Sequence, residues 1–181
     1  KEAAFTAIHD LILNNCATIQ LIDILQNLFE PYGIVAETNY NLMMDWDHII
    51  EMSKDPFVTI GSHTINHYSL MSLTPAELQR EIGDSKHQLE AKIGKRVDHF
   101  AYPYGSRGQA GPREFEVAKN YRFKTMVTAR LSNIFPQHES HLECLPRIQA
   151  LEKFRELNIL KRDLSGVISL YHNKFHRIVT T

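Results

Sequence analysis

The chain has 181 residues, 43% hydrophobic content and a formal net charge of −1, which suits one globular domain with a buried core. The near-zero charge argues against nucleic acid as a partner, because neutralising phosphates takes a basic surface. No run of about 18 apolar residues is present, and no cleavable signal pattern opens the chain. Cys16 and Cys144 fit no metal-binding spacing, so we expect two free buried thiols, with a disulfide between them as the alternative.

Two amphipathic helices are expected at the start of the chain. Apolar residues recur at helical spacing over residues 3–14 and again over residues 18–29. We interpret residues 1–40 as a helical insert. The alternative is an independent helical hairpin with no catalytic relevance.

A third helix is expected over residues 45–53 and closes before Lys54-Asp55-Pro56. Its apolar side chains, and two methionines just before it, are expected in the core. These residues are Met43, Met44, Trp46, Ile49, Ile50 and Met52.

The most informative stretch runs from Phe57 to His67. Residues 57–60 favour a strand that ends at Gly61, and the polar run that follows carries His63 and His67, four positions apart. If a helix follows the glycine, both imidazoles lie on one face, close enough to share a cation. Neutral imidazole suits zinc, and catalytic zinc sites usually take three protein ligands and leave a position for water. The alternative is two solvent-facing polar residues.

Helices and strands alternate after this stretch. Thr74-Pro75-Ala76-Glu77 is typical of a helix start, and this helix is expected to reach Gly94 and to cover the outside of a sheet. The next expected elements are a strand over 97–104, a helix over 111–120, a strand over 123–129, a loop over 131–141, a strand over 142–148, and helices over 152–161 and 164–176. Such an α/β architecture keeps its chemistry at the carboxyl ends of its strands.

Two segments resemble motifs of the polysaccharide deacetylase family. Residues 62–67, Ser-His-Thr-Ile-Asn-His, resemble the second motif, and residues 100–105, Phe-Ala-Tyr-Pro-Tyr-Gly, resemble the third. The resemblance covers roughly residues 42–148, and a looser likeness extends into both flanks. The resemblance implies an α/β fold, a distorted (β/α) barrel that is incomplete at its N-terminal side. We expect one structural domain made of a helical insert (1–40), a barrel portion (41–150) and a C-terminal helical segment (151–181).

The resemblance implies metal-dependent hydrolysis of N-acetyl groups on aminosugar glycans. His63 and His67 would hold a divalent metal, with zinc expected, and the main-chain N–H of Tyr104 would help to hold the oxyanion. The residues expected to line the acetamide pocket are Tyr102, Pro103 and Gly105. For the two tyrosines the alternative is aromatic packing.

Two further roles lack their usual residue. Many family members carry an Arg where this chain has Ala101, and there it pairs with the catalytic carboxylate. Arg147, in Leu-Pro-Arg-Ile at the end of a later strand, is expected to restore that charge, with a structural ion pair as the alternative. The family's usual general acid is a His in a late Leu-x-His motif. We do not recognise that motif in the chain, and His141 is the expected stand-in.

The family's first motif, Thr-Phe-Asp-Asp-Gly, supplies the catalytic base and the third metal ligand, and no Asp-Asp pair occurs in the chain. Asp45 and Asp47 are the nearest carboxylates ahead of the histidines, but both read as residues of a helix start. Because residue 1 is Lys rather than Met, we expect this chain to be the later part of a longer protein. The alternative is a non-catalytic carbohydrate-binding relative with a degenerate site.

An acetylated aminosugar glycan is the expected partner. We expect the basic end of the chain, with Lys174, His176 and Arg177, to be solvated, and the alternatives are that it rests on a membrane surface or on a partner. The compartment is left open between the bacterial cell envelope and the cytoplasm. The oligomeric state is not predicted.

Overall fold

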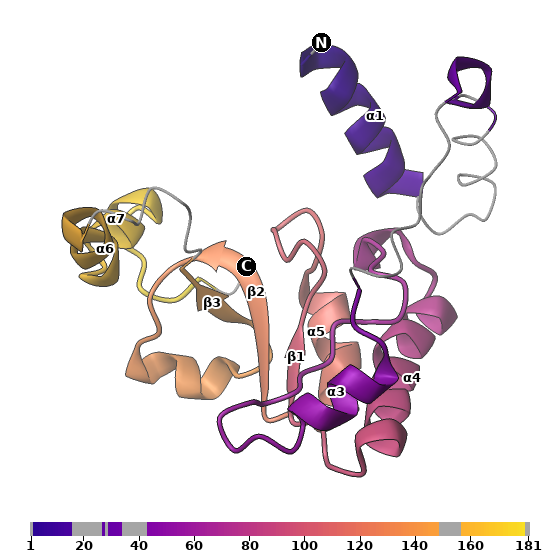
Figure 1. The fold of residues 1–181 in the computed structure, drawn as a ribbon. Coiled ribbons are helices and arrows are strands. Elements are labelled where there is room, and N and C mark those ends of the chain that lie inside the picture. Colours follow the sequence, from indigo (N-terminus) through magenta and orange to yellow (C-terminus); the bar gives the residue numbers. More distant parts are fainter. Residues whose placement is uncertain (1, 16–26, 28, 34–42, 149–156, 180–181) are drawn as a thin grey trace.

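The structure is a computed structural model that describes residues 2–15, 27, 29–33, 43–148 and 157–179 (Figure 1). The predicted helix over residues 18–29 falls mostly outside these ranges. The elements are α1 (Glu2–Asn15), η1 (Glu30–Tyr32), α3 (Trp46–Met52), η3 (Leu70–Ser72), α4 (Pro75–Ile93), β1 (His99–Ala101), α5 (Pro112–Lys119), β2 (Thr125–Leu131), η4 (Pro136–His141), β3 (Leu145–Arg147), α6 (Leu157–Leu164) and α7 (Val167–His172). Within the described ranges, no helix is both long and apolar enough to cross a membrane.

Three parallel strands form the sheet, in the order β1-β2-β3. β1 pairs with β2 over its whole length, and β3 pairs with β2 across an irregularity between Val127 and Leu131. On the other edge of β1, Ser62 forms an isolated parallel bridge with Phe100. The predicted α/β fold is therefore confirmed. The described residues form an open sheet, and the distorted, incomplete barrel stays a prediction.

The long helix α4 begins and ends where its sequence predicts. The Thr74 hydroxyl accepts a hydrogen bond from the Glu77 N–H, and the Glu77 carboxylate accepts one from the Thr74 N–H, so two N-terminal donors are satisfied. Gly94 ends the helix in the left-handed conformation, with φ 65°. Leu78 and Ile82, on the predicted apolar stripe, are fully buried.

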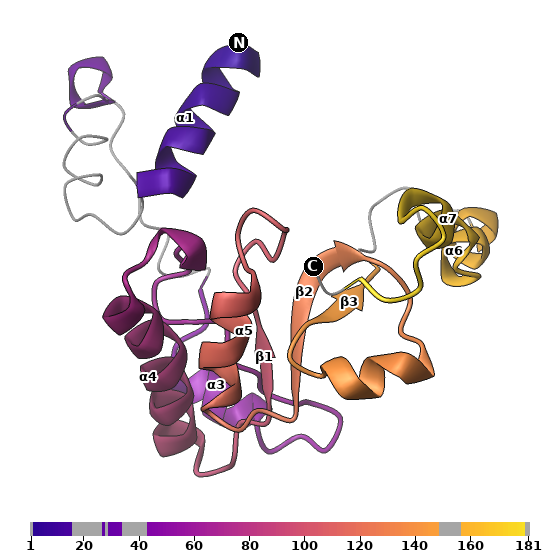
Figure 2. The same cartoon turned by 180° about the vertical axis from the view of Figure 1, so that it is seen from behind.

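The core lies between the sheet and two helices. Both views show α5 over one face of β1, with α4 beside it (Figures 1 and 2). The Phe100 and Phe123 rings stack with centroids 5.2 Å apart, and Tyr102 meets the edge of Phe115 at 5.1 Å. The buried cluster comprises Leu70, Leu73, Leu78, Ile82, Val97, Phe100, Tyr102, Ala110, Phe115, Ala118, Phe123, Met126 and Cys144. Cys144 is a free buried thiol, as expected, whereas Cys16 lies outside the described residues.

Residues 57–60 do not form the predicted strand. The Asp55 carboxylate accepts a hydrogen bond from the Phe57 N–H at 2.8 Å, and the Asp55 carbonyl accepts one from the Val58 N–H. These bonds hold a turn, and the Phe57 side chain is 95% exposed. Strand pairing begins only at Ser62. The other strands are shorter than predicted or shifted by about two residues: β1 replaces 97–104, β2 replaces 123–129 and β3 replaces 142–148.

The apolar residues of the helix at 45–53 do not reach the core as predicted, and only Ile49 and Ile50 are half-buried. α3 contains no buried residue, and Met43 and Met44 before it are mostly exposed. α3 packs at the surface against α4, where Lys92 places its Nζ 5.5 Å from the centroid of the Trp46 ring. The indole is therefore covered by a lysine side chain rather than by the core, and it stays 39% exposed.

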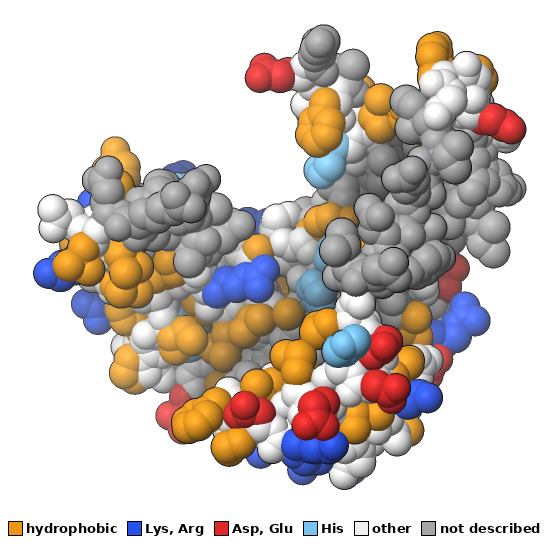
Figure 3. Space-filling view, in the orientation of Figure 1, with side chains coloured by type: hydrophobic (Ala, Val, Ile, Leu, Met, Phe, Trp, Pro, Cys, Tyr) orange, Lys and Arg blue, Asp and Glu red, His pale blue; other side chains and the backbone are white. Residues whose placement is uncertain are grey.

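The molecule is deeply notched at one end. In the same orientation, Figures 1 and 3 show α1 above the sheet on one side and α6 with α7 beside the arrowhead of β2 on the other. The space-filling surface between them is hollowed (Figure 3). The carboxyl ends of the strands therefore face the open side of the molecule.

Candidate active site

The segment before His63 is tied to the edge of β1. The Ser62 N–H donates to the His99 carbonyl at 2.8 Å, and the Ala101 N–H donates to the Ser62 carbonyl at 2.9 Å. His63 therefore lies at the carboxyl end of β1, where its Nδ1 is 2.7 Å from the Ala101 carbonyl oxygen. Because a carbonyl only accepts, Nδ1 carries the proton and Nε2 keeps its lone pair. That is the tautomer in which Nε2 can bind a metal.

A loop, not the helix considered from the spacing, brings His67 to His63. Thr64 and His67 have left-handed backbones, with φ 66° and 57°, and the Thr64 hydroxyl accepts a hydrogen bond from the His67 N–H at 3.1 Å. The chain turns back on itself, so the two imidazole centroids lie 4.7 Å apart with their planes at 77°. The two rings are therefore together, and metal binding by them stays a prediction.

Glu81, on α4, holds the loop between the two histidines. One carboxylate oxygen accepts from the N–H groups of Ile65 and Asn66 at 3.0 and 2.9 Å, and the other accepts from the Asn66 amide at 2.6 Å. The Glu81 side chain is buried. Such a carboxylate fixes the backbone of the loop, because each of its bonds would otherwise have to be made with water.

The turn after β1 brings Tyr104 to the same place. Its backbone has φ 59°, and its ring meets the edge of the His67 ring at 4.9 Å. Gly105 also has a positive φ, 65°, and its carbonyl accepts from the Ala129 N–H at 2.9 Å. A Cβ at Gly105 would lie 2.5 Å from the Ala129 nitrogen, so only glycine fits between this turn and β2.

Electrostatics at the site favour neutral imidazole. Burial lowers the pKa of His63, and the nearby charges of His67 and Arg147 lower it further, whereas the hydrogen bond that His63 donates to the Ala101 carbonyl raises it. Arg147, at the end of β3, is exposed and lies within electrostatic range of His63. Arg147 makes no hydrogen bond or ion pair with the residues that the structure describes. Its predicted contact with a catalytic carboxylate stays a prediction.

Tyr102 and Pro103 do not line a pocket. Both side chains are fully buried, and the Tyr102 hydroxyl donates to the Glu143 carbonyl at 2.8 Å. Burial raises the pKa of the Tyr102 phenol. The tyrosine points into the α5 side of the sheet, because side chains alternate along the strand and its neighbour Ala101 faces the other way. The packing alternative is therefore the one that the structure supports.

His141 lies at the wrong end of the sheet for the predicted role. It ends η4, ahead of β3, and the next residue, Leu142, accepts a hydrogen bond from Met126 near the start of β2. Figure 1 shows the short orange helix of residues 136–141 beside the amino end of β2. His141, Glu143 and Cys144 offer donor atoms within 4.8 Å of one another, but Glu143 already pairs with Lys119 at 3.4 Å. This cluster therefore cannot supply the remaining ligands of a metal site at His63.

Two residues near the site were not predicted from the sequence. Glu81 sits three positions after Leu78 on the apolar stripe of α4, and a charged residue on such a stripe signals a buried partner. The second is His172, since Leu170-Tyr171-His172 has the Leu-x-His pattern that we did not recognise. His172 is exposed at the end of α7, and both views show α7 beside the carboxyl end of β2 (Figures 1 and 2).

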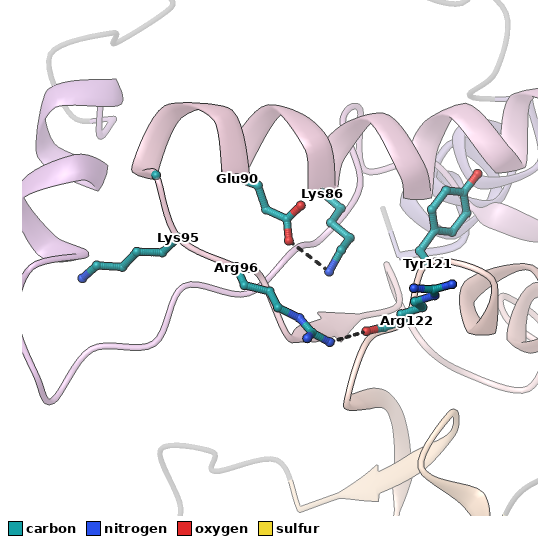
Figure 4. Close-up of a pocket in the computed structure, with 7 residues that line it drawn as sticks. Lys86, Glu90, Lys95, Arg96, Tyr121 and Arg122 are labelled. Carbon is teal, nitrogen blue, oxygen red and sulfur yellow. Dashed lines mark hydrogen bonds and ion pairs between the residues drawn. The ribbon is translucent and has the colours of Figure 1, made fainter.

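A surface hollow of about 600 Å³ lies away from the histidines (Figure 4). It is lined by the end of α4 and by residues that precede β1 and β2, so it opens at the amino ends of the strands. Its cations are largely engaged. Lys86 pairs with Glu90 at 3.2 Å, Arg96 donates to the Arg122 carbonyl at 3.3 Å, and Lys95 donates to the Ser53 carbonyl. The hollow therefore offers little unpaired charge to a ligand.

The donor set fits a divalent cation in part. His63 has its Nδ1 fixed by a carbonyl, which is the second contact that metal-binding histidines usually make, and His67 lies against it. Two nitrogens are fewer than the three protein ligands of a typical catalytic zinc site. Asp45 does not supply the third, because it caps α3 by accepting from the His48 N–H at 2.9 Å.

Comparison with known proteins shows the family to which this chain belongs. A sequence model of the family described as polysaccharide deacetylase matches residues 11–125, which is more than half of the chain. The chain therefore belongs to the polysaccharide deacetylase family. It is also similar to a gellan lyase from a Bacillus species, with 30% identity over an alignment 111 residues long; the alignment covers 56% of this chain and 4% of that protein.

Solved structures share the fold. The Streptococcus pyogenes deacetylase PplD, in complex with acetate, matches with 24% identity and a TM-score of 0.58, over 65% of this chain and 50% of that one. A polysaccharide deacetylase from Bacillus cereus matches with 24% identity and a TM-score of 0.51, over 58% and 32%. The chain thus spans half or less of each of these relatives. At this identity, the likeness supports the fold and leaves the residue roles to be argued from the site.

Proposed function

We propose that this chain carries the metal-binding half of a deacetylase that hydrolyses N-acetyl groups on aminosugar glycans. Membership of the family supports a hydrolase that acts on amide bonds. The observation that carries the proposal is the meeting of three side chains from two separate segments. His67 lies 4.7 Å from His63 and 4.9 Å from Tyr104, measured between ring centroids, beside the carboxyl end of β1.

In this proposal His63 and His67 hold a divalent cation, and zinc is the first choice because neutral imidazole is among its usual ligands. The cation would activate a water molecule and polarise the acetamide carbonyl. The Ala101 carbonyl keeps the proton of His63 on Nδ1, and Glu81 keeps the loop closed, so both rings are positioned before the cation arrives.

Other roles fall to residues around this pair. The Tyr104 N–H would donate to the oxyanion that forms on the substrate carbonyl, and the turn with Gly105 would hold that N–H in place. The positive charge of Arg147 would favour the ionised form of the catalytic carboxylate in place of the family's arginine. His172 takes the role of general acid, since His141 lies at the far end of the sheet. In this proposal the base and the third ligand are two carboxylates elsewhere in the protein.

The test is acetate release from oligomers of N-acetylglucosamine by the intact protein. His63→Ala should abolish release and metal binding and leave cooperative unfolding intact, because the core residues Leu78 and Ile82 are untouched. His87→Ala is the matched control, since His87 is exposed on α4, and it should keep both.

Two results would contradict the proposal. Turnover by His63→Ala in chelator-treated buffer would rule out a mechanism that needs this ligand. Oligomer binding by the wild-type protein with zinc, but without acetate release, would instead identify a carbohydrate-binding relative.

A further inference from the structure

The C-terminal hairpin, defined here as residues 157–179, comprises α6, α7 and the turn after them. α6 and α7 pack against each other, and Gly166 joins them with a left-handed φ of 80°. Asn133, just after β2, fastens the hairpin to the sheet: its amide donates to the Leu164 carbonyl at 2.9 Å, and its carbonyl accepts from the Ser169 hydroxyl at 2.8 Å. The hairpin is thus held by polar contacts at its inner side.

Large apolar side chains cover the outer part of the C-terminal hairpin. Each is more than half exposed, and Tyr171 and Phe175 are about three-quarters exposed. These residues are Leu157, Leu164, Val167, Tyr171 and Phe175. A patch of this kind costs free energy in water and usually marks a surface that is covered by something else.

The exposed charges on the C-terminal hairpin are all positive. It carries four basic residues, Lys161, Arg162, Lys174 and Arg177, against one acidic residue, Asp163. Asp163 is paired with Arg162 at 3.0 Å and its side chain is only 12% exposed. The hairpin therefore has a net charge of +3, whereas the whole chain has −1, which leaves −4 for all other residues. In Figure 3, apolar and basic side chains lie intermixed over α6 and α7.

We propose that the C-terminal hairpin docks on an anionic lipid surface. Apolar side chains set among lysines and arginines suit the boundary between headgroups and acyl chains, where the rings are buried and the cations stay near phosphate. The remainder of the chain is acidic, so an anionic surface attracts the hairpin and repels the body. Docking in this way orients the molecule. α7 lies beside the carboxyl end of β2, so the rim that carries His63 is held near the lipid surface (Figures 1 and 2).

The experiment is co-sedimentation of the full chain with vesicles of phosphatidylglycerol and phosphatidylcholine, against vesicles of phosphatidylcholine alone. We expect binding to the anionic vesicles, weakened as salt rises from about 0.1 to about 1 M. Lys161→Glu with Lys174→Glu should reduce the affinity about tenfold or more, because each cation near the surface contributes to attraction. Tyr171→Ser with Phe175→Ser should reduce it without changing its salt dependence.

Matched controls lie on the other side of the molecule. Phe57→Ser removes a side chain that is 95% exposed, and Lys92→Glu reverses an exposed charge on α4; both should bind as the wild type does. Circular dichroism should show the same helix content in all variants, and the charge-reversal pair remains informative if the double serine variant unfolds.

Three outcomes would overturn the proposal. One is the absence of binding to either kind of vesicle. Another is that the hairpin variants and the control variants lose affinity for anionic vesicles equally. The third is self-association of the wild type that Tyr171→Ser with Phe175→Ser abolishes while vesicles stay unbound, which would assign the apolar surface to a second copy of the chain.

Discussion

Glu81 is the residue on which the shape of the histidine loop depends most directly. Two residues of the loop adopt left-handed backbones, which cost a non-glycine residue roughly 1–2 kcal/mol each. The carboxylate of Glu81 offsets this cost with three hydrogen bonds to Ile65 and Asn66. It acts as a positioning residue, since its contacts are with the loop and not with either imidazole.

We predict that Glu81→Gln weakens zinc binding about 10- to 100-fold, because an amide cannot accept at both positions and the loop loses part of its support. Competition with a chromophoric chelator measures the affinity. Glu77→Gln is the control. Its amide oxygen can still accept from the Thr74 N–H, so the start of α4 stays capped, and the variant should bind zinc as the wild type does. Equal zinc affinities in the two variants would show that Glu81 only supports α4.

The kinetics of two variants distinguish His172 from His141 as the general acid. His172→Ala should lower kcat about 10²- to 10⁴-fold if His172 is the general acid. His141→Ala should leave kcat within about twofold, since His141 lies at the amino end of β3. Steady-state acetate release measures both. The reverse pattern would return the role to His141 and refute the placement argued from the strand ends.

Among the elements, the turn between β1 and α5 is the most constrained. We predict that Gly105→Ala destabilises the fold by about 2–4 kcal/mol, from a left-handed alanine and from contact of its Cβ with the β2 backbone. Gly94→Ala has the same φ, 65°, but meets no atom within 4 Å, and should cost only about 1 kcal/mol. Urea unfolding gives both values. Similar losses would mean that the turn can move away from β2.

Sequence patterns predicted some elements well and others poorly, for physical reasons. α4 was predictable because its cap residues, apolar stripe and final glycine are all local signals. Residues 57–60 were not, because one carboxylate, Asp55, favours a turn over the strand propensity of the residues after it. The meeting of His63, His67 and Tyr104 was predicted from two motifs at strand ends. Their loop geometry was not, because it depends on Glu81, which is distant in sequence.

Some predictions depended on which way a side chain points, and a sequence pattern does not show this. Tyr102 and Tyr104 both follow β1, but only Tyr104 turns toward the histidines, since Tyr102 continues the inward alternation of the strand. Sequence alone could not choose between them. Likewise Met43 and Met44 are apolar and adjacent to a helix, yet nothing in the pattern shows that this helix lies at the surface.

Over the whole molecule, the two ends of the sheet differ in character. The carboxyl end carries His63, His67, Tyr104 and Arg147 and faces the open notch between α1 and the C-terminal hairpin (Figure 3). The amino end carries His141, Glu143 and Cys144, where burial raises the pKa of the Cys144 thiol to about 11. A thiol held in its protonated form is a poor metal ligand. The chemistry is therefore expected at the carboxyl end alone.

The measurement that tests this account most directly is a crystal structure with zinc, with anomalous scattering recorded at the zinc edge. We expect a single strong peak bound to nitrogens of both His63 and His67 at about 2.0–2.1 Å, with the Glu81 contacts to the loop intact. A peak at His141, Glu143 and Cys144 instead, or no peak within reach of the two histidines at saturating zinc, would contradict it.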